Sequence, residues 1–428
     1  MAWAADPGAA IRPMLAGIPL EFGLFALVLL GVAVLQQHTL RVAVVGAITI
    51  TFYQLMFTGF KGGAGLAGLV NHLGHEWVTL ANLLGLLLGF ALLADQFEKS
   101  RVPEVMPRFL PDDWKGGFGL LVGVFVMSSF LDNIAAAMIG GSMAGVLFKR
   151  RVHIGFLAAI VAASNAGGAG SVVGDTTTTM MWIAGVNPLW VLEAYAGGGV
   201  ALLIFGVIAA RQQHAYQPIQ KDDTPGARVD GVRLAVVLLV LLAAIGVNLW
   251  FNLRDPAVLD HWPVIGGAVV LALLLTAPVR MPTWSLLPGA FQGSVFLLSL
   301  VWCASLMPVQ HLPDPSWPTT LGLGFVSAVF DNIPLTALAI RQDGFDWGFL
   351  AYAVGFGGSM IWFGSSAGVA LAGMYPEARS VLAWLRGGWH VALAYVVGFF
   401  VMLVLVGWHP HPIKQGPAPA TAVAGLTK

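Results

Sequence analysis

Long apolar runs separated by short polar segments dominate this chain of 428 residues. A run of about 20 apolar residues is long enough to cross a lipid bilayer as a helix. The pattern predicts such helices at residues 20–37, 42–60, 77–95, 190–210, 232–250, 262–279, 286–307 and 383–407. The most polar internal segment, residues 211–231, predicts a loop between two halves. The pattern therefore indicates an all-α polytopic membrane protein.

Two further apolar segments are interrupted by an Asp-Asn pair. Residues 117–148 contain "SSFLDNI", with Asp132 and Asn133 at the centre, and residues 319–340 contain "SAVFDNI" around Asp331. Each arm of the first segment holds roughly 15 residues and would extend about 22 Å as a helix, short of a bilayer core of about 30 Å. Each segment is therefore either one kinked crossing or a re-entrant hairpin with the Asp at its tip.

Two more segments, residues 155–185 and 348–373, are interrupted by glycines. They contain "SNAGGAGSVVGDTTTTMMW" and "GFGGSMIWFGSSAG", in which a Gly-Gly pair is followed by a third glycine at the same offset. The next residue is Asp175 in one half and Ser365 in the other. Each half thus holds an Asp-Asn break and then a Gly-Gly break. This order predicts two repeats, residues 1–210 and 232–408, joined by a linker at 211–231 and followed by a tail at 409–428.

The distribution of Lys and Arg favours hairpins at both Asp-Asn segments. With two hairpins and two broken crossing helices, the chain crosses the membrane about ten times and its halves are inverted, as in secondary transporters. Fifteen of the 21 basic residues then lie on the side of the 211–231 linker, which the positive-inside rule makes cytoplasmic. A full crossing at 117–148 would instead separate the basic run at 99–115 from "KRR" at 149–151. The six basic residues on the other side are Arg12, Lys61, Arg254, Arg341, Lys414 and Lys428.

Composition excludes several other classes of protein. Hydrophobic residues make up 57% of the chain and charged residues 10%, which fits a protein surrounded by lipid. The net charge of zero argues against a nucleic-acid partner. The single Cys303 excludes an internal disulfide framework. We expect no cleaved signal peptide, since the N-terminus lacks a basic start before an apolar core. No catalytic constellation stands out, so we expect neither an enzyme nor a cofactor.

The interruptions concentrate oxygen ligands where lipid would otherwise be expected. Non-helical backbone is tolerated inside a membrane only where protein buries it or where it lines a cavity. Hard oxygen ligands around a carboxylate suit a cation such as Na⁺. Asp175 and Asp331 are candidates because intramembrane carboxylates are usually functional, although each Asp could also cap the half-helix that follows it. The other candidate ligands are Asp132, Asn133, Ser164, Asn165 and Thr176, with Asp132, Asn133 and Asn165 as the expected Na⁺ ligands.

Two groups of histidines lie outside these breaks. The cluster "NHLGHEW", with His72, His75 and Glu76, could form a metal site or proton relay, but a polar helix entry beside an interfacial Trp explains it equally well. His409 and His411 are expected in a solvated tail.

Taken together, four motifs resemble those of the NhaD-type sodium/proton antiporters. These antiporters belong to the ion transporter superfamily, which also contains citrate and dicarboxylate carriers. The motifs are "SSFLDNI", "AASNAGGAGSVVGDTTTTMMW", "SAVFDNIPL" and "GFGGSMIWFGSSAGVALAG". The resemblance implies two inverted repeats, a homodimer and elevator-type alternating access, in a bacterial cytoplasmic membrane. It also implies an ion site with one half from Asp132, Asn133, Asn165 and Asp175, and the other from Asp331, Asn332, Ser359, Ser365 and Ser366.

The predicted function is exchange of Na⁺ or Li⁺ for H⁺, with Na⁺-coupled transport of citrate or a dicarboxylate as the alternative. A carboxylate can hold either Na⁺ or a proton, as antiport requires. Citrate carriers of the superfamily place Ser-Asn-Thr at the hairpin tips, and an Asp at both tips would repel an anionic substrate. The interiors of the interrupted segments contain no Lys or Arg to hold citrate.

Overall fold

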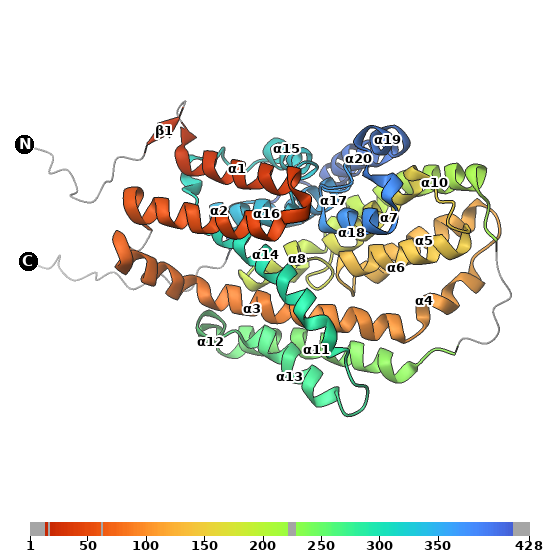
Figure 1. The fold of residues 1–428 in the computed structure, drawn as a ribbon, viewed down its shortest axis with the longest axis horizontal. Coiled ribbons are helices and arrows are strands. Elements are labelled where there is room, and N and C mark those ends of the chain that lie inside the picture. Colours follow the sequence, from red (N-terminus) through yellow and green to blue (C-terminus); the bar gives the residue numbers. More distant parts are fainter. Residues whose placement is uncertain (1–12, 16–17, 61–62, 221–227, 414–428) are drawn as a thin grey trace, which may run out of the picture.

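The computed structural model describes residues 13–15, 18–60, 63–220 and 228–413, and in these ranges the fold is almost entirely helical (Figure 1). The exception is an antiparallel pair of two-residue strands, β1 (Met14–Leu15) and β2 (Ile18–Pro19), directly before the first helix. The predicted all-α membrane class is therefore confirmed, apart from this short pair.

Within the described ranges, five helical segments are long and apolar enough to cross a membrane. A sixth candidate is formed by α19 (Val381–Gly387) and α20 (Trp389–Leu405), which are bent by 61°. The five segments are α2 (Thr39–Tyr53) with η2 (Gln54–Thr58), α3 (Gly65–Lys99), α9 (Pro188–Val191) with α10 (Ala194–Tyr216), α11 (Gly231–Arg254), and η4 (Trp284–Leu286) with α14 (Leu287–Ser305).

The two remaining predicted spans form shorter helices. They are α1 (Leu20–Val34), with 15 residues, and α13 (Val264–Thr276), with 13 residues. Short helices connect the longer ones: η1 (Gln36–His38), α4 (Val102–Val105), η3 (Met106–Phe109), α12 (Pro256–His261), η5 (Val309–His311) and η6 (Pro376–Arg379).

All four interrupted segments form pairs of short helices with a non-helical break between them. The Asp-Asn segments give α5 (Trp114–Ser128) with α6 (Asn133–Leu147), and α15 (Trp317–Ser327) with α16 (Asn332–Gln342). The Gly-Gly segments give α7 (Ile154–Ala169) with α8 (Thr176–Ile183), and α17 (Trp347–Gly357) with α18 (Ser366–Met374). Because α5 packs against α6, the first Asp-Asn segment folds back on itself instead of continuing as one helix.

The first arms of the two Gly-Gly segments form the centre of the molecule. Every residue of α17 is buried, as is every residue of α7 from Gly155 to Ala169. α7 packs against α5, α10 and α17, and α17 packs against α15 and α20. Both breaks that follow these helices are therefore enclosed by protein, which meets the requirement that irregular backbone inside a membrane is shielded from lipid.

A second group of helices lies beside this centre and consists of α1, α2, α3, α11, α13 and α14 (Figure 1). α3 packs against α11, α13 and α14, and α14 also packs against α2. α14 also packs against α16 of the second Asp-Asn segment. The ion-site candidates thus lie at the breaks around the centre of the molecule, and α16 connects them with the second group of helices.

Part of the predicted linker is helical, and the start of the predicted tail makes contacts with the protein. Residues 211–216 belong to α10, and the Arg211 guanidinium lies 4.9 Å from the centroid of the Trp114 ring. The first five residues of the tail include three exposed ones, His409, Pro410 and Pro412, as expected for a solvated segment, but two contacts also anchor them to the protein. His411 stacks on Trp190 at 4.2 Å between ring centroids, and the backbone N–H of His409 donates to Asp346. Residues 221–227 of the linker and 414–428 of the tail lie outside the described residues.

Candidate functional site

Four short helices begin at the candidate site, and a predicted site residue caps each of them. Asp132 accepts the Ile134 N–H at the start of α6, at 3.1 Å, and Asp331 accepts the Ile333 N–H at the start of α16, at 3.0 Å. Asp175 caps α8 and Ser365 caps α18. The capping role considered for these residues is therefore real. It leaves most acceptor positions of each carboxylate available, because an ionised carboxylate has about four lone-pair sites.

The breaks in the two halves have the same local conformation. Asp132 and Asp331 both have φ −52° and ψ 141°. Asp175 has φ −143° and ψ 142°, and Ser365 has φ −142° and ψ 153°. The residues that cap the helices at corresponding breaks thus have similar backbone conformations.

The first glycine of each Gly-Gly pair lies in close contact with the neighbouring Asp-Asn segment. A Cβ atom on Gly167 would lie 2.1 Å from the carbonyl oxygen of Phe125, and one on Gly357 would lie 2.3 Å from that of Gly324. Two hydroxyls add the same cross-link in each half: Ser128 donates to the Ser164 carbonyl at 2.5 Å, and Ser327 to the Val354 carbonyl at 2.7 Å. These contacts hold each hairpin tip against a broken helix.

Side-chain amides join the two halves at the centre of the site. The Asn133 amide donates to Asn165 Oδ1 at 3.0 Å and to Asp175 Oδ1 at 3.2 Å. The Asn165 amide in turn donates to Ser359 Oγ at 2.9 Å and to Ser365 Oγ at 3.0 Å. Asn165 is completely buried. Its two ends therefore face different halves of the chain and connect the two sets of predicted ligands.

Asp175 is the most central carboxylate and is only 2% exposed. The Thr177 hydroxyl donates to its Oδ2 at 2.6 Å, and the Asn332 amide approaches the same oxygen at 3.5 Å. Asp175 is also electrostatically repelled by Asp132 and by Asp331. In the described part of the chain, no ion pair involves any of these three carboxylates. Asp132 and Asp331 are half-buried, and like charges that are withdrawn from water in this way need a cation or protons to balance them.

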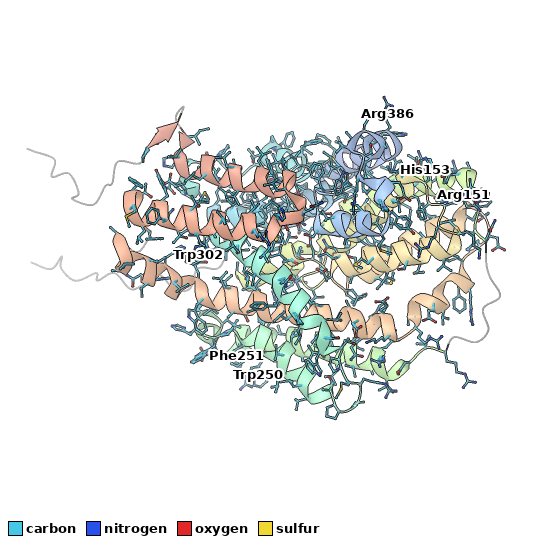
Figure 2. The ribbon with its side chains drawn as sticks, in the orientation of Figure 1. Arg151, His153, Trp250, Phe251, Trp302 and Arg386 are labelled. Carbon is cyan, nitrogen blue, oxygen red and sulfur yellow. The ribbon has the colours of Figure 1, made fainter. Side chains whose placement is uncertain are left out.

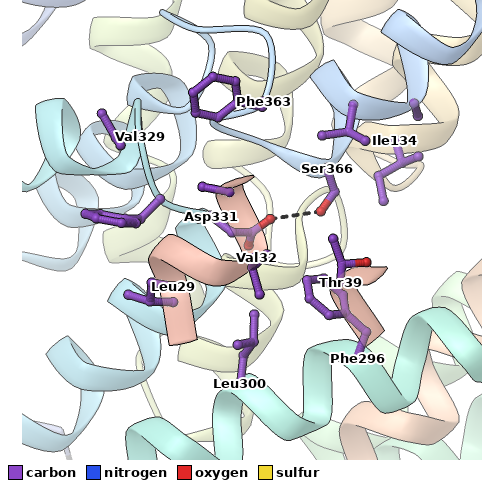
Figure 3. Close-up of a pocket in the computed structure, with 14 residues that line it drawn as sticks. Leu29, Val32, Thr39, Ile134, Phe296, Leu300, Val329, Asp331, Phe363 and Ser366 are labelled. Atoms are coloured by element: carbon purple, nitrogen blue, oxygen red, sulfur yellow. Dashed lines mark hydrogen bonds between the residues drawn. The ribbon is translucent and has the colours of Figure 1, made fainter. Parts of the chain in front are cut away.

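Asp331 lines a cavity of about 290 Å³ (Figure 3). Its Oδ2 accepts the Ser366 hydroxyl at 2.9 Å, as the dashed line in Figure 3 shows. The remaining wall is mainly apolar and comes from α1, α14 and α18 together with the hairpin tips. Asp331 thus faces a cavity, whereas Asp175 is enclosed.

The structure brings most of the predicted ligands together, with two differences. The hydroxyl of Ser164 does not face the amide network, since it donates to the Val161 carbonyl of its own helix at 2.9 Å. Thr176 is buried at the start of α8, but the hydroxyl that reaches Asp175 is that of Thr177. A side chain two residues after an N-cap Asp is well placed to reach the cap, so the helix start was the signal for Thr177.

Gly355 occupies the position in the second half that Asn165 has in the first, two residues before the Gly-Gly pair. A Cβ atom there would lie 3.1 Å from the Ala169 Cβ and 3.4 Å from Asp175 Oδ2. We expect Gly355→Ala to weaken apparent Na⁺ affinity about fivefold and to destabilise the fold by about 1–3 kcal/mol through overpacking. Transport kinetics and thermal unfolding in detergent measure the two effects.

Gly322→Ala is the matched control, because a Cβ atom at this helical glycine meets nothing within 4 Å. It should leave Na⁺ affinity unchanged. Equal Na⁺ affinities for the Gly355→Ala variant and the unmodified protein would show that the space beside Asp175 does not affect the ion.

No protein-family model matches the chain. The chain is nevertheless similar to several characterised proteins. It is 27% identical over 392 residues to Na(+)/H(+) antiporter NhaD of Vibrio parahaemolyticus, which covers 75% of this chain and 89% of that protein. It is 25% identical over 338 residues to the NhaD antiporter of Vibrio cholerae, covering 66% of this chain and 68% of the relative.

A plant protein shows the same level of similarity. Sodium/proton antiporter 1 of Arabidopsis thaliana is 27% identical over 340 residues, which are 69% of this chain. The match spans only 55% of the length of that relative. These relatives are named as transporters, and they confirm the resemblance that the four motifs indicated.

Proposed function

The chain resembles the NhaD-type sodium/proton antiporters, and from this premise we propose that it exchanges Na⁺ or Li⁺ for H⁺ across a membrane. The observation that carries the proposal is the set of three carboxylates, Asp132, Asp175 and Asp331, without an ion-pair partner among the described residues. A site of this kind attracts a cation and, in its absence, protons. Exchange of the two ions at the same carboxylates is antiport.

The amide network supports the following proposed roles for individual residues. Asp175 and Asp132 supply the charge that attracts Na⁺. Asn133 and Asn165 each have one amide oxygen that can turn toward a cation. The side-chain amide of Asn133 already donates to Asn165 and to Asp175. Ser359 and Ser365 hold the Asn165 amide from the other half. Asp331, with Ser366, lies at the cavity and is the first carboxylate that an ion entering through it would meet.

We assign the chain an architecture of two inverted repeats with about ten crossings. The end of α10 and the start of α11 would face the cytoplasm, with β1 on the opposite side. In support, Figure 1 places β1 and the end of α10 at opposite ends of the molecule, and Figure 2 places Arg151 and His153 at the α10 end. A bacterial cytoplasmic membrane and a homodimer remain part of this proposal, as the resemblance implied.

Ion fluxes in proteoliposomes test the proposal. An outward Na⁺ gradient should drive proton uptake that a pH-sensitive dye inside the vesicles reports, whereas labelled citrate should not enter in either the presence or absence of Na⁺. Empty liposomes and the Asp175→Asn variant are the controls. Sodium-dependent citrate uptake without sodium-driven proton flux would overturn the antiporter assignment and favour carboxylate transport.

A further inference from the structure

An ion pair far from the site joins its second hairpin to the neighbouring helix group. Arg341 is the penultimate residue of α16, and its Nη2 donates to Oε2 of Glu76 in α3. The two residues are 265 positions apart in the chain. Their side chains are only 18% and 11% exposed. A polar helix entry was one of the two interpretations of Glu76 from the sequence, but this residue lies inside α3 and is buried against Arg341.

The helix that carries Arg341 also carries part of the ion site. α16 begins after the Asp331 cap, and its first residue, Asn332, is the one whose amide approaches Asp175. Arg341 lies ten positions after Asp331, which is about 15 Å along the helix axis. A displacement of the Arg341 end therefore moves the Asn332 end, because an 11-residue helix behaves as a rigid rod.

Glu76 lies on a part of α3 that is firmly held. One turn earlier, His72 Nε2 lies 2.9 Å from Ser305 Oγ at the end of α14. Trp302 packs edge-on against His72 with ring centroids 5.1 Å apart, and its indole N–H donates to Thr51 of α2 at 2.8 Å. Figure 2 labels Trp302 on this side of the molecule. The carboxylate of Glu76 thus forms a fixed point for the Arg341 guanidinium.

We propose that Glu76 and Arg341 are positioning residues for the ion site, since the pair sets where α16 presents Asp331 and Asn332. Neither residue contacts the site itself. Removing one partner leaves the other charge unpaired in a poorly hydrated place, and such a charge moves toward water. The free end of α16 would shift with it, and Asn332 would lose its approach to Asp175. The inference rests on the proposed cation site for its consequence, but not for the movement of α16.

Two single variants and a charge exchange test the pair. Glu76→Gln and Arg341→Gln should each weaken Na⁺ binding to the purified protein about fivefold or more, measured by calorimetry. The double variant Glu76→Arg/Arg341→Glu restores an ion pair with its direction reversed, and should return the affinity to within about twofold, because coupled residues are not additive. If the two side chains mattered only through their packing, reversing their charges would not restore the Na⁺ affinity.

Hydrogen–deuterium exchange over residues 332–342 gives a readout that does not depend on Na⁺. Exchange should accelerate in both single variants and return toward the unmodified rate in the double variant. Asp230→Asn is the matched control. Arg280 donates to Asp230 at 2.9 Å and holds the pKa of that carboxyl below its usual value, and Asn keeps the helix cap. This variant breaks an ion pair remote from α16 and should change neither readout.

The outcomes separate the two proposals. Unchanged exchange of α16 in the single variants, or failure of the charge exchange to restore it, overturns the positioning role. If the unmodified protein binds no Na⁺ while α16 responds as expected, the cation site fails and the role of the pair in placing α16 stands.

Discussion

Replacing Asp175 by Asn is expected to abolish sodium-driven proton flux while the protein remains folded in the membrane. The substitution keeps the shape of the side chain and its ability to cap α8, because Asn is as good an N-cap as Asp. It removes the enclosed negative charge that the Asn133 amide and the Thr177 hydroxyl surround. We expect a loss of about a hundredfold or more in flux, since in the proposed mechanism Asp175 holds both the cation and the proton.

Asp132→Asn should behave in the same way if the two first-half carboxylates act together. Asp113→Asn is the matched control, because Asp113 also caps a helix, α5, but lies at its exposed start away from the site. Membrane levels and size-exclusion profiles should be equal for all three variants. Normal flux in the Asp175→Asn protein would reduce Asp175 to a helix cap and leave the proposed mechanism without its central charge.

Lowering the pH is expected to raise the apparent KM for Na⁺, because protons and Na⁺ compete for one set of carboxylates. Where a single proton competes and the pH lies below the pKa of the cluster, the KM for Na⁺ should rise about tenfold for each unit by which the pH falls. The maximal rate at saturating Na⁺ should change less, since excess Na⁺ displaces the protons. The carboxylates interact with one another, so only the titration of the whole cluster is observed and not that of one Asp.

Sodium titrations of proton flux at several pH values measure this competition. Citrate transport would give a different result, because uptake would follow the charge state of citrate and Na⁺ would stimulate it. A KM for Na⁺ that stays constant between about pH 6 and about pH 9 would show that the two ions do not share a site.

The sequence was most informative where polar residues or glycines interrupt an apolar segment. On either side of Asp132 and Asp331 the apolar run is too short to span a membrane, so a break at each position was predictable. In the structure, α6 and α16 begin directly after these two residues. The Gly-Gly pairs were also informative, because their spacing repeats and the backbone there passes close to the hairpins.

Contacts between distant parts of the chain could not be predicted in the same way. Asn165 donates to Ser359 and Ser365, which lie 194 and 200 positions away, and nothing in the local pattern specifies that pairing. The choice of Thr177 over Thr176 depends on how α8 is rotated about its axis. The Glu76–Arg341 pair and the contacts of His409 and His411 could not be predicted for the same reason, since each depends on a tertiary neighbour.

The four helix starts at the site also determine its charge balance. Each helix N-terminus carries a partial charge of about +0.5, so four starts contribute about +2. The helices concerned, α6, α8, α16 and α18, are capped by Asp132, Asp175, Asp331 and Ser365. The three carboxylates, when ionised, contribute −3 together, which leaves about −1 at the site. One bound Na⁺ would bring this sum close to zero, so the loaded site could lie within the membrane without a net charge.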